Sequence, residues 1–245
     1  MIDIHCHILP YTDDGSDSME DSLEMARAAA ATGITAIIAT PHCNLPYSES
    51  KNYRSQELSV RFHALRQAVE DADIPVQIYP GAEVLCTPQV PELLRQGKLH
   101  TLADSRYLLV EFFFDESPDY MDEMLSSIDK EGYIPVIAHP ERYEAIQRTP
   151  YILERWFQKG WVIQLNKGSI LGRLGRRAET AADWILAHGL AHTVASDAHR
   201  PHFRTTNMTE LTEYLQQVCQ PEYVDILLNI NPNRILNDLP ILQAE

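Results

Sequence analysis

The sequence opens with Ile2-Asp3-Ile4-His5-Cys6-His7, a short alternation of apolar and polar residues that ends in a His-x-His pair. In a β-strand, residues two apart point to the same side, so His5 and His7 are expected to converge while Cys6 faces away. Two converging imidazoles can bind one metal ion. The stretch therefore predicts a strand that carries metal ligands at its carboxyl end.

Apolar runs typical of buried strands recur along the chain, and each is followed within a few residues by a His, Asp, Glu or Asn. The expected strands are residues 2–7, 34–40, 76–80, 107–113, 134–138, 161–165 and 191–195. Helical patterns separate them, at about residues 18–32, 53–72, 88–98, 121–130, 150–159 and 176–188, with a helical tail at 207–236 that is broken near Pro221. This alternation predicts parallel βα units.

Seven such units favour an α/β fold with a closed or nearly closed barrel, in which functional residues lie at the carboxyl ends of the strands. A doubly wound open sheet is the alternative, but it would scatter these residues over two halves of an edge. No Gly/Ser linker, charge block or low-complexity tract marks a domain boundary within the 245 residues. A single domain is therefore expected.

Charge and composition argue against several classes of protein. The formal net charge of -15 disfavours binding to nucleic acid or to an anionic membrane. There is no run of about 18 apolar residues to span a membrane and no basic amino-terminal region typical of a signal peptide. The four cysteines form no CxxC pair, so neither a disulfide scaffold nor a zinc knuckle is expected. A reducing cytoplasm is the expected location.

Nine residues at or just beyond the expected strands have side chains that bind divalent metals. They are His5, His7, Asp14, His42, Glu83, Glu111, His139, Asp197 and His199. Imidazole and carboxylate together suit Zn, Mn or Fe, and this number of ligands, with a bridging carboxylate, suits two or three ions. Glu111 is embedded in apolar residues, where an unpaired carboxylate is costly. Among the other histidines, only His202 lies near the site in sequence, and its role is left open.

Several motifs together resemble the PHP (polymerase and histidinol phosphatase) superfamily. They are His5-x-His7, Asp13-Asp14-Gly15, Thr40-Pro41-His42, Gly81-Ala82-Glu83, Ile137-Ala138-His139-Pro140-Glu141-Arg142-Tyr143 and Ala195-Ser196-Asp197-Ala198-His199. Within it, the chain is similar to the bacterial manganese-dependent protein-tyrosine phosphatases of capsule and exopolysaccharide loci, in register from residue 1 to about 236. Carboxylates at Asp14 and Glu111 point to this branch, whereas Cys6 departs from its usual serine.

The resemblance implies a distorted seven-stranded (β/α) TIM-like barrel of PHP type, with residues 1–245 forming one metallophosphatase domain. It implies up to three divalent metal ions. Mn²⁺ is the expected metal, and Fe, Zn or Co are alternatives. The implied ligand sets are His5, His7, Glu83 and Asp197 for one ion, Glu83, Glu111 and His139 for a second, and Asp14, His42 and His199 for a third. Glu83 would then bridge two ions.

Phosphoryl transfer also needs positive charge around the phosphate oxygens, and the guanidinium fork of arginine matches their geometry. Arg142, three residues beyond His139, is the first candidate for this catalytic role. Arg204, seven residues beyond Asp197, is the second. The resemblance supports both, and Arg200 is a weaker third candidate.

A cysteine-dependent mechanism would require the pattern His-Cys-x5-Arg. The arginine position holds Thr12 after Cys6 and Glu49 after Cys43, so neither His-Cys pair fits. A phenol leaves with a pKa of about 10, so a strong general acid is not essential. The sequence therefore favours a metal-dependent mechanism.

The expected function is hydrolysis of phosphotyrosine in a protein. The resemblance implies that the substrate is a tyrosine autokinase, which controls polysaccharide polymerisation and export. One alternative is a small phosphoester such as histidinol phosphate. Another is a metal-binding regulatory domain without turnover, which the retention of all nine ligands argues against. Four aromatic residues on expected mouth loops could frame an aryl phosphate: Tyr11, Tyr47, Tyr143 and Phe203. The alanine-rich helix at 18–32 could pack against another subunit, since family members form homo-oligomers.

Overall fold

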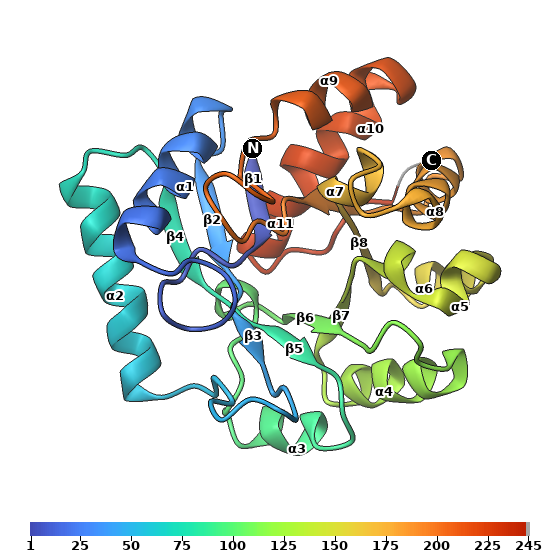
Figure 1. The fold of residues 1–245 in the computed structure, drawn as a ribbon. Helices are drawn as coiled ribbons and strands as arrows, with labels where there is room; N and C mark the ends of the chain where they lie inside the picture. The colour runs from blue at the N-terminus through green and yellow to red at the C-terminus, as the bar shows by residue number, and fades with distance from the viewer. Residues whose placement is uncertain (244–245) are drawn as a thin grey trace.

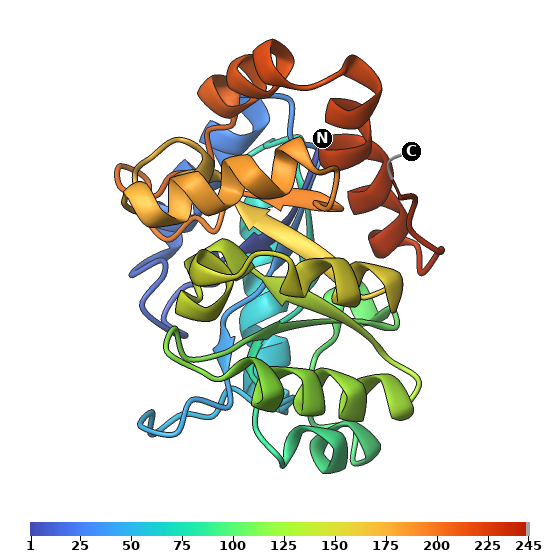
Figure 2. The same ribbon diagram turned by 90° about the vertical axis from the view of Figure 1, so that its right-hand side faces the viewer.

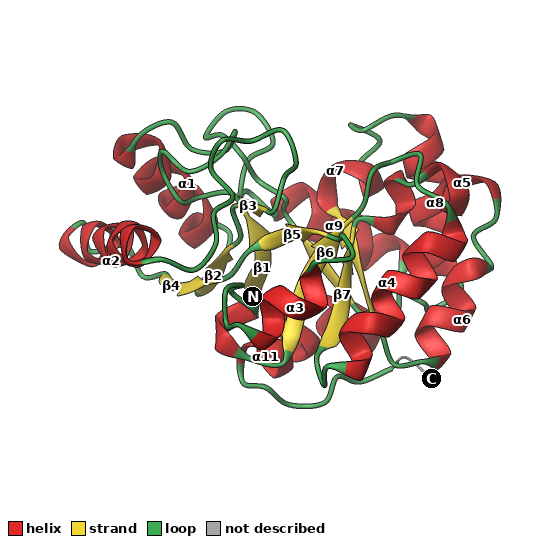
Figure 3. Ribbon diagram, turned by 90° about the horizontal axis from the view of Figure 1, so that it is seen from below, coloured by secondary structure: helices red, strands yellow, loops and turns green. Residues whose placement is uncertain are grey.

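Parallel strands occupy the middle of the molecule and helices lie around them (Figures 1 and 3). The structure is a computed structural model that describes residues 1–243. Within these residues the strands are β1 (Ile2–Cys6), β2 (Ala36–Ala39), β3 (His42–Cys43), β4 (Gln77–Pro80), β5 (Glu83–Leu85), β6 (Tyr107–Glu111), β7 (Ile134–Ala138), β8 (Val162–Asn166) and β9 (Thr193–Ala195). The α-helices are α1 (Met19–Ala31), α2 (Gln56–Asp71), α3 (Val90–Arg95), α4 (Pro118–Lys130), α5 (Glu144–Arg148), α6 (Ile152–Gln158), α7 (Lys167–Ile170), α8 (Arg176–Ala187), α9 (Thr209–Val218), α10 (Pro221–Asp225) and α11 (Asn231–Leu236).

The strands form two parallel sheets, in the orders β1-β2-β4 and β3-β5-β6-β7-β8-β9. β1 also reaches the far edge of the second sheet, because Cys6 forms a bridge with Ala198, just beyond β9. The backbone N–H of Asp197 donates to the carbonyl of His5 over 2.9 Å at the same edge. Parallel strands with helices outside them give a TIM-like α/β fold.

The prediction of seven strands is incomplete, because two of the expected runs continue after a break. β3 follows β2 across Thr40 and Pro41, and β5 follows β4 across Gly81 and Ala82. A side chain at position 81 would place its Cβ only 2.7 Å from Cγ2 of Ile38, so the close approach of these two segments requires glycine. Beyond the breaks, His42 and Glu83 are paired residues on neighbouring strands.

Helix α1 forms where the sequence predicted it. The hydroxyl of Ser18 accepts a hydrogen bond from the backbone N–H of Asp21 over 3.1 Å, which caps the first turn. Met25, Ala26 and Ala29 are buried on the inner face of the helix. No helix within residues 1–243 has the length and apolar character needed to cross a membrane.

The carboxyl-terminal helices pack beside the amino-terminal strand (Figure 2). The expected break near Pro221 is confirmed, since α9 ends at Val218 and α10 begins at Pro221. The amide of the buried Asn231 donates to the carbonyls of His192 (2.9 Å) and Leu242 (2.8 Å), and its oxygen accepts from the N–H of Leu242 (2.7 Å). Asn231 therefore ties the tail to the chain just before β9.

His192 lies beneath this tail and is almost completely buried. Its Nδ1 accepts a hydrogen bond from the backbone N–H of Ile163 over 3.0 Å, so the ring is neutral there, and it stacks on Phe157. Burial lowers the pKa of His192 to about 4. The unfolded chain therefore binds more protons than the folded chain between the usual histidine pKa and pH 4, and stability falls as pH falls through this window.

We expect His192→Asn to reduce this pH dependence, because the asparagine oxygen can accept the same hydrogen bond without titrating. Between pH 7 and pH 4.5, the wild-type free energy of unfolding should fall by about 2 kcal/mol more than that of the variant. Urea unfolding of both proteins at the two pH values measures the difference. Equal losses in the two proteins would show that His192 does not carry this effect.

Candidate metal centre

All nine predicted metal ligands lie together at the carboxyl ends of the strands. His5 is in β1, His42 begins β3, Glu83 begins β5 and Glu111 ends β6. The others stand on the loops that follow β1, β7 and β9: His7, Asp14, His139, Asp197 and His199. Only the side chains of His42, at 19% exposure, and Asp14, at 69%, are substantially open to solvent.

Glu83 lies at the middle of the cluster. Its Oε1 is 2.8 Å from Nε2 of His139. Its Oε2 is 3.0 Å from Nδ1 of His42, 3.2 Å from Nε2 of His7 and 3.3 Å from Nε2 of His5. This buried oxygen makes no hydrogen bond to any described residue. A carboxylate oxygen surrounded by ring nitrogens in this way has the environment of a cation ligand.

The His-x-His pair is oriented by hydrogen bonds on its outer nitrogens. Nδ1 of His5 is 2.9 Å from the amide oxygen of Gln164, and Nδ1 of His7 is 2.7 Å from the Asp13 carboxylate. With the outer nitrogens engaged in this way, the two Nε2 atoms lie 3.2 Å apart. Two ring nitrogens this close can share one cation, and such outer hydrogen bonds are typical of metal-binding histidines.

The nine residues fall into overlapping groups, each able to surround an ion. The groups are His7, Asp14, His42 and His199; His5, His7 and Glu83; His5, His139 and Asp197; and His42, Glu83 and Glu111. Burial alone would raise the pKa of the Glu83 carboxyl, but the neighbouring His5 and His42 hold it well below its usual range. Glu83 is therefore a carboxylate at neutral pH, which is the form that binds metal. The donor set fits more than one divalent ion.

Asp197 joins the ligand cluster to the predicted arginines. Its Oδ1 is 3.5 Å from Nε2 of His7 and 3.6 Å from Nε2 of His5. Its Oδ2 faces Arg204, which donates to it, and lies 3.7 Å from Nη1 of Arg142. Burial would raise the pKa of Asp197, but His5 and Arg204 outweigh it and keep the pKa below its usual range.

The two arginines are placed by different means. Arg142 lies in a short 3₁₀ turn after His139, with its guanidinium carbon 4.4 Å from the centre of the Phe114 ring. Arg204 lies on the loop after β9 with a left-handed backbone (φ 53°). His139 (φ 38°) and Asp197 (φ 48°) share this unfavourable conformation.

The weaker candidates stay outside the cluster. Arg200 forms an ion pair with Asp17, and the exposed His202 lies 3.6 Å from Glu24. The remaining histidines are on α2 or packed elsewhere: His63 is exposed on α2, while His100, His188 and His192 lie against Phe62, Trp184 and Phe157.

Four supporting residues were not predicted as part of the site. Asp13 and Gln164 orient the histidine pair, and the amide of Asn166 donates to Oδ2 of Asp197. Glu141 in turn accepts the backbone N–H of Asn166 over 2.9 Å. The signal available in the sequence was a polar residue inside a buried strand, as at Gln164, or at the end of one, as at Asn166.

The expectation about the mouth aromatics is wrong for Tyr143. Its ring is fully buried, its hydroxyl donates to the carbonyl of Ala138 over 2.9 Å, and the N–H of Phe112 donates to that hydroxyl. Tyr11, Tyr47 and Phe203 are strongly exposed. Tyr143 is therefore a core residue that links the ends of β6 and β7.

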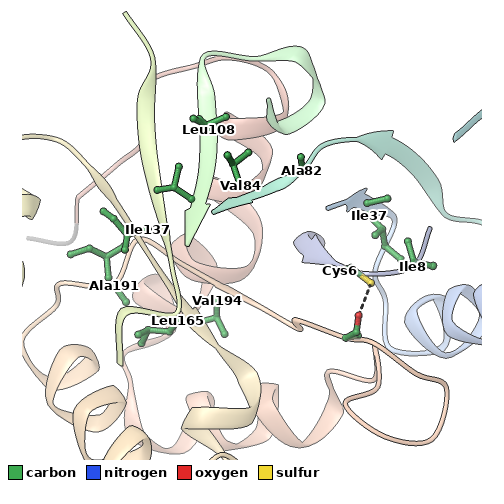
Figure 4. Packing of buried hydrophobic residues seen from close by; sticks show 14 of the residues in the cluster. Cys6, Ile8, Ile37, Ala82, Val84, Leu108, Ile137, Leu165, Ala191 and Val194 are labelled. Carbon is green, nitrogen blue, oxygen red and sulfur yellow. Dashed lines mark hydrogen bonds between the residues drawn. The ribbon is translucent and has the colours of Figure 1, made fainter. Parts of the chain in front are cut away.

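Cys6 points away from the histidines that flank it. Its side chain is buried among Ile8 and Ile37, and its Sγ faces the carbonyl of Ala198 at 3.8 Å (Figure 4). Burial raises the pKa of the Cys6 thiol well above its usual value and that of Cys43 to about 12. Neither thiol is ionised at neutral pH, so neither is a nucleophile.

We therefore expect Cys6→Ser and Cys43→Ser to keep activity within about threefold of wild type, because a neutral thiol contributes no nucleophile. Steady-state phosphatase kinetics, with metal content measured on the same samples, test this. Loss of activity in either variant at unchanged metal content would support a cysteine mechanism instead.

A parallel α/β fold that gathers histidines, carboxylates and arginines at the ends of its strands defines a metal-dependent enzyme of the TIM-like class. Its sequence family is equally clear. The model of the capsular polysaccharide synthesis family CpsB/CapC matches residues 1–237, and this chain belongs to that family.

Similar proteins extend the comparison along the whole chain. Tyrosine-protein phosphatase YwqE of Bacillus subtilis (strain 168) is 39% identical over 245 residues, covering 99% of this chain and 94% of the relative. One similar crystal structure comes from work on YwqE of Bacillus subtilis and CpsB of Streptococcus pneumoniae, which are described there as unique metal-dependent tyrosine phosphatases. The match covers 100% of this chain and 97% of that chain. It has a TM-score of 0.92 and 36% identity.

A more distant neighbour supports the fold alone. The phosphotriesterase homology protein of Escherichia coli has a TM-score of 0.61 at 10% identity, covering 95% of this chain and 97% of that chain. The TIM-like arrangement is thus shared well beyond the CpsB/CapC family.

Proposed function

We propose that this chain is a metal-dependent protein-tyrosine phosphatase. The observation that carries the proposal is the cluster around Glu83, in which an unpaired carboxylate oxygen faces three ring nitrogens while two arginines meet at Asp197. The names of similar proteins agree with it, since YwqE is called a tyrosine-protein phosphatase. The competing substrate is a small phosphoester such as histidinol phosphate.

The proposed metal ligands are all nine clustered residues. One ion would be held by His5, His7, Glu83 and Asp197, a second by Glu83, Glu111 and His139, and a third by Asp14, His42 and His199. Mn²⁺ is proposed first, with Fe, Zn or Co as alternatives that the same ligands accept. When bound, such ions polarise phosphate oxygens and acidify the attacking water.

The protein's own groups would position and neutralise the phosphate. Arg142 and Arg204 present N–H groups beside the ligand cluster, where they can hold the non-bridging phosphate oxygens and balance the charge that develops there. Asp197 keeps both guanidiniums close to the cluster. The phenolic leaving group needs no strong acid, because its pKa is about 10.

The wider biological setting is also part of the proposal. The substrate would be a phosphotyrosine protein, namely a tyrosine autokinase that regulates capsular or exopolysaccharide biosynthesis, in the cytoplasm. Four unpaired cysteines agree with a reducing compartment. Residues 1–245 would form a single PHP-type domain whose two sheets make one distorted seven-stranded barrel, with β2 and β4 continuing into β3 and β5. Homo-oligomers through α1 are proposed as well.

Metal-stripped protein re-supplied separately with Mn²⁺, Fe²⁺, Zn²⁺ or Co²⁺ tests the function. We expect stripping to abolish hydrolysis of a phosphotyrosine peptide and Mn²⁺ to restore it best, because the ligands must hold charge next to the phosphate. Histidinol phosphate is assayed in parallel. A higher kcat/KM on histidinol phosphate would favour the small-substrate alternative, and no turnover of any aryl phosphate after loading would contradict both.

A further inference from the structure

A cavity of about 500 Å³ opens directly beside the metal centre. Its lining includes three of the proposed ligands, Asp14, His42 and Glu111. It also includes apolar side chains, among them Leu45, Phe113 and Phe114. The metal centre and an apolar surface therefore share one open space.

The two phenylalanines are unusual in their exposure. Phe113 is 46% exposed and Phe114 is 44% exposed, although Phe112 immediately before them is buried at 2%. They follow the ligand Glu111 by only two and three residues. Neighbouring aromatic rings left open to water at the edge of a polar site are typical of a surface that a ligand covers.

Phe114 is held in place before any ligand binds. One face of its ring is covered by the guanidinium of Arg142, 4.4 Å from the ring centre. Its backbone carbonyl accepts the N–H of Glu144 over 2.8 Å. The ring thus connects the arginine proposed to hold the phosphate with the apolar wall of the cavity.

We propose that this cavity is an aryl subsite, in which the ring of an aryl phosphate packs against Phe113 and Phe114. The inference rests on the proposed function and assigns the residues that receive the aryl ring of its substrate. In an aryl phosphate the ring is bonded to the ester oxygen itself, so a phosphate held at Arg142 and the ligand cluster must place its ring within a few bonds of that point. The apolar wall next to Glu111 is at that place, and a serine or alkyl phosphate has no group to fill it.

The test compares two peptides of identical sequence that carry either phosphotyrosine or phosphoserine. We expect Phe113→Ala to lower kcat/KM about tenfold on the phosphotyrosine peptide and less than about twofold on the phosphoserine peptide, since only the aryl ring loses its packing partner. Phe113→Trp should restore the preference. Tyr151→Ala, which removes an exposed aromatic ring outside the cavity, should leave both values unchanged.

Phe114→Ala gives a second readout. Because it also releases Arg142, we expect it to lower activity on both peptides, with the larger loss on phosphotyrosine. Calorimetric titration with peptides bearing a phosphonomethyl-phenylalanine or an aliphatic phosphonate measures the same preference without turnover. Weaker binding of the aryl phosphonate alone to Phe113→Ala is the expected result.

The subsite is wrong if Phe113→Ala changes kinetics and phosphonate binding equally for aryl and alkyl groups, or changes neither. Failure of the proposed function looks different, because wild-type protein would then not hydrolyse the phosphotyrosine peptide at all. In that case the phosphonate titrations still decide whether the cavity prefers an aryl ring.

Discussion

Glu83→Ala should reduce phosphatase activity to less than about 1% of wild type, because loss of even an outer-sphere partner typically costs a metal site 10- to 100-fold. The two oxygens of Glu83 lie within 3.3 Å of nitrogens from four histidines. Its removal therefore takes ligation from two proposed ions at once. Activity on a phosphotyrosine peptide and metal content per chain are the measurements.

The control is Glu92→Ala, which removes an exposed carboxylate that pairs with Arg95 and Gln96 on and beside α3. It should bind metal and turn over substrate like wild type. Circular dichroism establishes that both variants are folded. If Glu83→Ala keeps more than a few per cent of activity with undiminished metal, Glu83 does not bridge.

Removal of either arginine should have the next largest effect. We expect Arg142→Ala and Arg204→Ala each to lower kcat/KM about 10²- to 10³-fold, the range found when one preorganised donor to developing charge is deleted. Lysine should not rescue either position, because its ammonium lacks the planar fork that matches phosphate. Metal content should stay unchanged, which separates this role from that of Glu83.

Arg200→Ala is the matched control for both arginines, since Arg200 is engaged by Asp17. Its loss should lower kcat/KM less than about threefold, as expected for a partly exposed ion pair. The double variant of Arg142 and Arg204 should lose less than the product of the single losses, because both guanidiniums meet at Oδ2 of Asp197. An Arg200 effect as large as the other two would contradict the assignment.

Most of the strand pattern and the nine clustered side chains could be predicted from the sequence because both depend on short-range patterns. A buried parallel strand is a continuous apolar run, and its carboxyl end is where the chain turns polar, as at Glu111 or His139. The helices with clear caps, such as α1, were equally accessible. These features need no knowledge of what packs against them.

The missed features depend on contacts between distant parts of the chain. The close approach of Gly81 to Ile38, beside the break between β2 and β3, brings together positions far apart in the chain. Gln164 and Asn166 act on His5 and Asp197, which lie more than 30 residues away. The burial of Tyr143 follows from its hydrogen bonds to the ends of two strands. The cavity proposed as the aryl subsite likewise combines segments around residues 14, 45 and 113.

The left-handed backbones of His139, Asp197 and Arg204 have a consequence for attempts to make this enzyme more robust. Each such residue costs about 1–3 kcal/mol relative to an ordinary conformation, and glycine would remove most of that cost. A selection that rewards only thermal resistance would therefore favour glycine at these three positions. It would recover more heat-resistant proteins that have lost a proposed metal ligand or a proposed phosphate-binding arginine, so any such selection must screen for turnover in the same round.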